Sequence, residues 1–173
     1  MMLAAALAAA AGCSSTPKIK PVAWTVSITK KTTASIQVDV IGVTETEWEY
    51  YKGLSLEDYW GKPESPDSQI RKDALKCGVT KLLEKDAWVL SAKTDPKHPE
   101  YDVQSDLWSQ WHNRRVVKLI LLARLPEAGG IWKYPLSLDK DAWNTSNQAK
   151  PERHTILIDV FDSKIYVETP KND

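Results

Sequence analysis

Apolar side chains alternate with small or polar ones along several stretches of the chain, which are residues 22–28, 36–40, 132–138, 156–160 and 165–167. A period of two is typical of a β-strand that buries one face. After the second stretch the phase of the pattern changes at Gly42, which predicts a bulge or bend there. The pattern as a whole predicts a mainly β protein.

The C-terminal third contains the clearest strands. Nearly every side chain in residues 116–125 is apolar, so we expect a central strand that is covered on both faces. A turn at 126–130 leads into residues 132–138, which should pair antiparallel with it, and Pro135 favours an edge position because proline cannot donate a hydrogen bond. Residues 156–167 read as a tight hairpin. Together these strands predict an antiparallel two-sheet sandwich.

The middle of the chain has a different pattern. Ser65 is a candidate helix N-cap and Pro66 suits the first helical position. Apolar residues then recur at helical spacing, so we expect a helical insertion over about residues 66–84, either continuous or broken at Gly78. The composition of residues 87–90 makes them a candidate for a further short strand.

The N-terminal residues 1–12 carry no charge and are rich in alanine. A helix that crosses a bilayer needs roughly 20 apolar residues, so this stretch is too short. It fits the apolar region of a secretory signal peptide, which usually has about 7–15 residues. Residues 10–13 resemble the lipobox of bacterial lipoproteins, in which the cysteine is acylated with fatty acids such as palmitate and the peptide is cut before it. The alternative is an alanine-rich start with an incidental cysteine.

This interpretation divides the chain into three parts. Residues 1–12 are the expected signal peptide, and residues 13–21 are the lipidated Cys13 followed by a polar tether with two prolines. Residues 22–170 are the expected sandwich domain with its helical insertion. If Cys13 carries lipid, Cys77 has no partner, so we expect no intramolecular disulfide and a small, buried thiol.

The net charge and the absence of catalytic motifs in the sequence limit the classes of function that fit. The 23 basic and 23 acidic residues balance, which gives no electrostatic reason to expect nucleic acid as a partner. His98, His112 and His154 are far apart and lack the close spacing of zinc ligands. The sequence has no P-loop, no nucleophile elbow and no dinucleotide fingerprint. We therefore expect no enzyme, no metal and no cofactor.

Eight tryptophans raise the question of a binding surface. Trp108 and Trp111, followed by polar and basic residues, resemble an exposed aromatic strip that could stack on sugar rings. The alternative is that this pair, three residues apart, forms one face of a helical turn packed on the sandwich. Trp24 and Trp132 lie in phase with the buried faces of their expected strands.

The order of these features resembles the outer-membrane lipoprotein of bacterial type VI secretion systems. The matching stretches are residues 119–124, 131–134, 156–160 and 165–167. The resemblance implies a transthyretin-like sandwich with a helical excursion, held at the outer membrane by lipid and facing the periplasm. It also implies a non-catalytic subunit that binds the periplasmic domain of an inner-membrane-anchored secretion protein.

In that family the loop between the first two strands contacts the partner. By position, the resemblance places partner binding here at Thr29, Lys30, Lys31, Thr32 and Thr33. We therefore expect a docking or scaffold subunit of an envelope-spanning secretion complex. The alternative function is a periplasmic or surface glycan-binding lipoprotein that uses exposed tryptophans.

Overall fold

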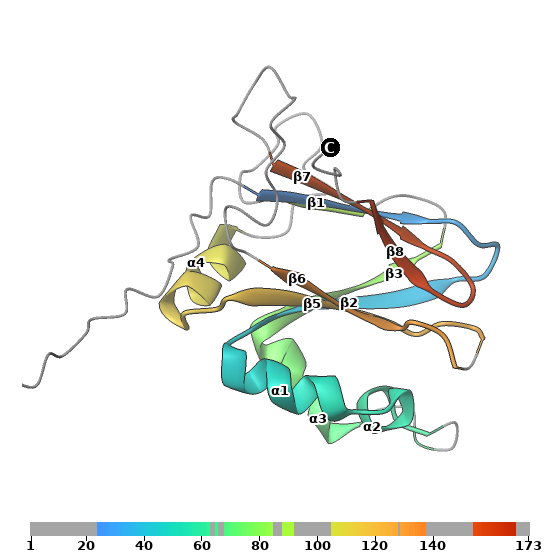
Figure 1. Ribbon diagram of the computed structural model, residues 1–173, viewed down its shortest axis with the longest axis horizontal. Coiled ribbons are helices and arrows are strands. Elements are labelled where there is room, and N and C mark those ends of the chain that lie inside the picture. Colours follow the sequence, from blue (N-terminus) through green and yellow to red (C-terminus); the bar gives the residue numbers. More distant parts are fainter. Residues whose placement is uncertain are drawn as a thin grey trace, which may run out of the picture.

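Two four-stranded sheets face each other, and short helices cover the outer face of one of them (Figure 1). This is seen in a computed structural model that describes residues 24–62, 65, 68–84, 88–91, 105–127, 129–137 and 154–168. The predicted mainly β sandwich is confirmed. The expected signal peptide and tether, with Cys13, lie outside the described residues.

The first sheet has the order β4-β1-β7-β8, and its strands are β4 (Trp88–Ser91), β1 (Trp24–Lys30), β7 (His154–Val160) and β8 (Ile165–Glu168). The predicted hairpin of β7 and β8 is confirmed, as is the short strand β4. The sheet is not antiparallel throughout, because β1 pairs in parallel with β7 over its whole length. Hairpin neighbours must be antiparallel, whereas β1 and β7 are far apart in sequence and are free of that constraint.

The second sheet is antiparallel throughout and has the order β3-β2-β5-β6, with β3 (Gly78–Leu83), β2 (Ile36–Val43), β5 (Lys118–Ala123) and β6 (Lys133–Ser137). β5 lies inside the sheet and is buried on both faces, as its continuous apolar sequence predicts. β6 lies at the edge, with Pro135 opposite Ile120. Both predictions for this part of the chain are therefore confirmed.

The predicted bulge at Gly42 is wrong. β2 pairs without interruption from Val38 opposite Ala123 to Val43 opposite Lys118. The apolar pattern changes phase because both faces of β2 are buried at this point. Gly42 has another role: a Cβ atom there would lie 2.5 Å from the indole ring of Trp111, so the missing side chain makes room for that ring.

The helical insertion begins and ends earlier than predicted, at residues 45–77 instead of 66–84. The helices are α1 (Glu45–Gly53), α2 (Leu56–Trp60), α3 (Gln69–Ala74), the 3₁₀ helix η1 (Leu75–Cys77) and, later in the chain, α4 (Ser105–Asn113). Residues 78–83, expected to be helical, form β3 instead. The spacing of Val79, Leu82 and Leu83 imitates a helical stripe, but Leu82 is 51% exposed and Leu83 is buried, as alternation along a strand requires.

Side-chain caps set where these helices start. Ser68, and not the predicted Ser65, is the N-cap of α3, because its hydroxyl accepts a 3.0 Å hydrogen bond from the Arg71 N–H. Thr44 and Ser55 form capping boxes at the starts of α1 and α2. Each cap satisfies backbone donors that a first helical turn leaves without a partner.

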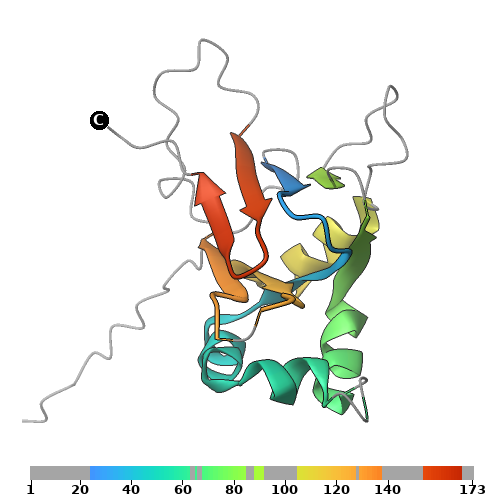
Figure 2. The same cartoon turned by 90° about the vertical axis from the view of Figure 1, so that its right-hand side faces the viewer.

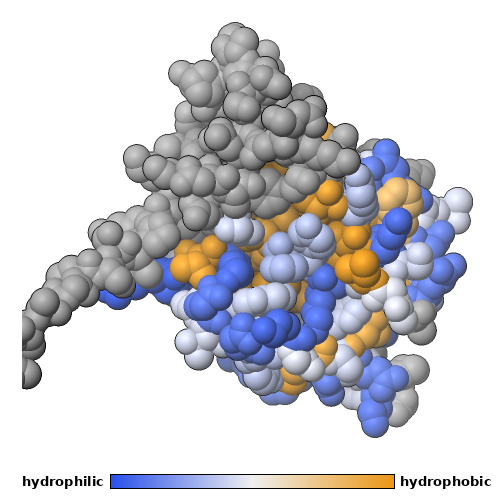
Figure 3. All heavy atoms as spheres, viewed as in Figure 1, coloured by the Kyte–Doolittle hydropathy of each residue, from blue (hydrophilic) through white to orange (hydrophobic). Residues whose placement is uncertain are grey.

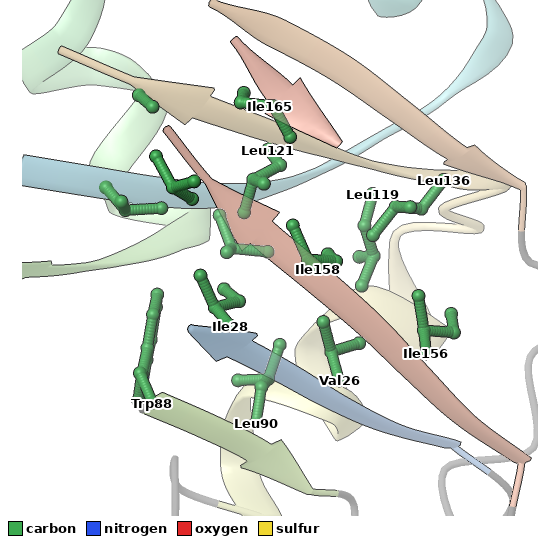
Figure 4. Packing of buried hydrophobic residues seen from close by; sticks show 14 of the residues in the cluster. Val26, Ile28, Trp88, Leu90, Leu119, Leu121, Leu136, Ile156, Ile158 and Ile165 are labelled. Atoms are coloured by element: carbon green, nitrogen blue, oxygen red, sulfur yellow. The ribbon is translucent and has the colours of Figure 1, made fainter. Parts of the chain in front are cut away.

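The core between the sheets is apolar (Figure 4). It is built by inward-facing side chains of both sheets, among them Val26, Ile28, Leu90, Ile156 and Ile158 from the first sheet and Leu119, Leu121 and Leu136 from the second. Each side chain of this size stabilises the fold by about 1.5–3 kcal/mol when it leaves water. Burial of the side chains on one face of each strand is therefore a main favourable contribution to the stability of the sandwich.

A second, smaller core lies between the helices and the outer face of the second sheet. Ile41, Val43, Ile120 and Leu122 supply the sheet side, and Tyr59, Trp60 and Ala74 supply the helix side.

Among the described helices, none combines the length and the apolar content needed to cross a bilayer.

A buried ion pair fixes the helical layer on this sheet. Asp39 of β2 is fully buried, and the Arg71 guanidinium of α3 donates to both of its carboxylate oxygens at 2.7 and 3.1 Å. The Tyr59 hydroxyl donates to the same carboxylate at 2.9 Å. Burial, and then the nearby Asp39 carboxylate, raise the pKa of Tyr59, so the phenol stays protonated as a donor. The Arg71 guanidinium also lies 4.7 Å from the ring centroid of Trp60.

Replacing Arg71 by methionine should lower the free energy of unfolding by about 3–5 kcal/mol, because the Asp39 carboxylate would remain buried without its counter-charge. The measurement is the urea unfolding curve of the purified protein. Lys76→Met is the control, since it removes an ion pair to Asp73 that is exposed on both sides and should leave the curve nearly unchanged. Equal shifts in the two variants would show that Asp39 does not depend on Arg71.

Candidate docking site at one end of the sandwich

Three loops meet at one end of the sandwich. They are the β1–β2 loop (residues 31–35), the connection from β5 to β6 (residues 124–132, without 128) and the β7–β8 turn (residues 161–164). They lie at the right-hand end in Figure 1, and this end faces the viewer in Figure 2. The first and third loops are neighbours because parallel strands end at the same edge of a sheet, and Lys30 of β1 lies opposite Val160 of β7.

Asp162 of the β7–β8 turn contacts both other loops. Its carboxylate accepts a hydrogen bond from the Thr32 hydroxyl, and its carbonyl oxygen accepts one from the Glu127 N–H at 3.2 Å. The Lys31 N–H also donates to the Val160 carbonyl at 2.8 Å. The three loops are therefore tied together by side-chain and backbone bonds.

The β1–β2 loop is also ordered by its own residues. Lys30 Nζ donates to the Ala34 carbonyl at 2.9 Å, and the Ala34 N–H donates to the Thr32 hydroxyl at 3.2 Å. Lys31 Nζ lies 3.8 Å from a carboxylate oxygen of Asp159. Of the five residues predicted to bind a partner, Thr29 and Lys30 end β1 and the other three lie in the loop. Their role in binding stays a prediction.

Backbone packing leaves no space between the second and third loops. A Cβ atom at Gly130 would lie 1.6 Å from the Ser163 carbonyl oxygen. Beside this contact the Ile165 N–H donates to the Ile131 carbonyl at 2.8 Å, which joins the edge of the second sheet to the edge of the first. Only glycine allows the two loops to approach so closely.

Ile131 is an exposed apolar side chain that sequence reasoning missed. Large apolar side chains are exposed at five described positions, and Ile131, at 58%, is the one that lies in the three loops. The sequence placed it between a turn and a strand without indicating which way it points. The Gly-Gly step before it was the available signal, because it indicates a close backbone contact beside residue 131.

The exposed aromatic strip proposed for Trp108 and Trp111 does not exist. Both side chains are fully buried in the core between the sheets, and their rings meet edge to face with centroids 4.9 Å apart. The alternative, a helical turn packed on the sandwich, is confirmed: α4 closes the end opposite the loops (Figure 1). The glycan-binding interpretation therefore loses the residues on which it was based. Trp132 is half-buried between the two cores.

Among the residues that the structure describes, the remaining candidate chemistry offers no second site. Within the described residues, no group of three or more histidine, cysteine, aspartate and glutamate side chains could hold a metal ion. Cys77 has a free thiol and is half-buried, so it is less buried than predicted. Its carbonyl oxygen accepts a 2.8 Å hydrogen bond from the Trp111 indole N–H. His98 and the side chain of Trp24 lie outside the described residues.

Comparison with known proteins finds similar folds among solved structures. The chain matches no protein-family model, and it matches no curated protein. Among solved structures it is similar to Serratia marcescens Lip, a membrane-bound component of the type VI secretion system, with 11% identity over 86% of this chain and 98% of that one and a TM-score of 0.46. It is also similar to the T6SS lipoprotein TssJ1 from Pseudomonas aeruginosa, with 7% identity over 89% and 100% and a TM-score of 0.46. The sandwich is established by the strand pairing of this chain itself.

The two buried tryptophans should respond differently to replacement by phenylalanine. Trp111→Phe removes the donor to the Cys77 carbonyl and leaves that oxygen unpaired, which should cost about 1–3 kcal/mol beyond the loss of ring area. Trp108→Phe removes an indole N–H that has no partner among the described residues, so it should lose only ring area. Urea unfolding midpoints of the two variants test this, and equal losses would contradict it.

Proposed function

We propose that this chain is a non-catalytic lipoprotein of the bacterial outer membrane that faces the periplasm. Lipid on Cys13 holds it at the membrane, and the three-loop end of the sandwich docks a partner. The partner is the periplasmic domain of an inner-membrane-anchored protein, and the assembly is an envelope-spanning secretion complex of the type VI class. This role needs no cofactor.

The direction of β1 is the observation that carries this proposal. β1 begins at Trp24, close behind the expected tether, and its seven residues span about 20 Å at the rise of an extended strand. It ends at the three loops. If the chain is held at the membrane through residue 13, β1 separates the tether from the three docking loops.

The order within the loops also supports docking. Loops that are already ordered lose little conformational entropy when a partner binds, whereas mobile loops must first be fixed at a cost in free energy. The bonds of Thr32 and Lys30 fix the β1–β2 loop in the free protein, while Lys31 and Thr33 remain exposed. These two side chains are available for a partner without rearrangement of the loop.

Replacing Cys13 by serine should abolish acylation, because only the thiol accepts the lipid. The variant should move from the membrane fraction to the soluble periplasmic fraction of the producing bacterium and lose the mass of the acyl chains. Fractionation with immunoblotting and intact-mass measurement are the tests. A variant that stays with the membrane would overturn the proposed anchor.

Docking is tested with the purified periplasmic domain of the inner-membrane protein encoded in the same secretion gene cluster. Thr33→Trp places a bulky side chain on the exposed loop and should raise the Kd at least about tenfold, which corresponds to about 1.4 kcal/mol. Lys52→Trp, on the exposed surface of α1, is the matched control and should bind like the wild type. Absence of binding by the wild-type chain would overturn the proposed function, and equal binding by Thr33→Trp would overturn the role of the loop.

A further inference from the structure

The β1–β2 loop lacks an apolar contact residue of its own. Its exposed side chains include Lys31 and Thr33, and its sequence from 31 to 35 contains no apolar residue larger than alanine. Protein interfaces gain most of their affinity from a few apolar, aromatic or arginine side chains near the centre of the contact. A docking surface at this end therefore needs a contribution from a neighbouring loop.

Ile131 is positioned to supply that contribution. It is 58% exposed, yet its backbone is held by the hydrogen bond from the Ile165 N–H and by its bridge to Lys164. Apolar surface reaches this end of the molecule among hydrophilic residues in Figure 3. An isoleucine fixed in this way can enter a partner's pocket with little loss of conformational entropy.

Lys164 adds a charge directly beside Ile131. The two residues form an isolated β-bridge just before β6 and β8 begin, and the Lys164 ammonium lies 5.8 Å from the Phe161 ring centroid. Lys164 is exposed and forms no ion pair with a carboxylate of the described residues. Two acidic residues on its own hairpin are engaged elsewhere, Asp162 with Thr32 and Asp159 with Lys31.

The three loops together are slightly basic. They carry Lys31, Arg124 and Lys164 against Asp162 and Glu127. A complementary partner surface therefore has an acidic side chain next to an apolar pocket. One exposed isoleucine and a net charge of this size are too little for stable attachment to a lipid surface, which takes a larger apolar face or a polybasic patch.

We propose, on the basis of the proposed function, that Ile131 and Lys164 form the centre of the docking surface. Ile131 enters an apolar pocket of the partner, and Lys164 pairs with a carboxylate at the rim of that pocket. The docking surface thus spans three loops, and Asp162 is a positioning residue that holds the β1–β2 loop beside this pair.

The test measures binding of the same purified periplasmic domain to single variants of the full chain. Ile131→Ser should raise the Kd at least about tenfold. Lys164→Glu should also weaken binding, and the wild-type affinity should fall with salt more steeply than that of Lys164→Ala. Leu157→Ser is the matched control, because Leu157 is an exposed aliphatic residue on β7, outside the loops, and it should bind within about twofold of the wild type. Unchanged urea midpoints establish that all variants fold.

Four outcomes overturn the inference. In the first, the wild type binds, Thr33→Trp weakens binding and Ile131→Ser leaves it unchanged. This result would show that the chain docks through the β1–β2 loop alone. Loss of binding in Leu157→Ser as large as in Ile131→Ser would show that the contact is not centred on the loops. Flotation of the Cys13→Ser chain with phosphatidylethanolamine and phosphatidylglycerol vesicles, abolished by Ile131→Ser, would assign the surface to lipid. Absence of any wild-type binding to the domain would instead overturn the proposed function as well.

Discussion

The parallel pairing of β1 with β7 is the constraint on which the loop end depends. Because the two strands run in the same direction in register from Trp24 opposite His154 to Lys30 opposite Val160, they finish side by side. The β1–β2 loop and the β7–β8 turn then leave the sheet as neighbours, and Asp162 can reach Thr32. An antiparallel pair in this position would place the two loops at opposite ends of the molecule.

The second sheet differs from the first because it packs on both faces, against the helices on one side and against the first sheet on the other. Its β2 strand does this by burying both faces, with apolar side chains toward each core and one charged residue, Asp39, under the helices. A buried ion pair gives little net stability because both charges lose their hydration. It does require one arrangement of α3 on β2, since only there does the Arg71 fork meet both carboxylate oxygens.

Most of the sandwich could be predicted because strand periodicity is a local signal. The edge position of Pro135 and the central position of residues 118–123 both followed from hydrogen-bonding capacity and from burial on both faces. The error at residues 78–83 came from a short apolar run that fits a helix and a strand alike, and only tertiary pairing with β2 decides between them. The candidate site was predicted in part: the resemblance indicated the β1–β2 loop, whereas the exposure of Ile131 depends on contacts between loops that are distant in sequence.

The contact of Gly130 with the Ser163 carbonyl affects how this end of the protein can change during evolution. Surface loops usually accept insertions and deletions, but any change that puts another residue in place of Gly130 would bring a Cβ atom against the Ser163 carbonyl oxygen. A chain that keeps this contact can vary more freely at the outward-facing positions of the same loops, such as residue 131. Backbone packing sets the shape of this end, while its surface chemistry is set by a few exposed side chains.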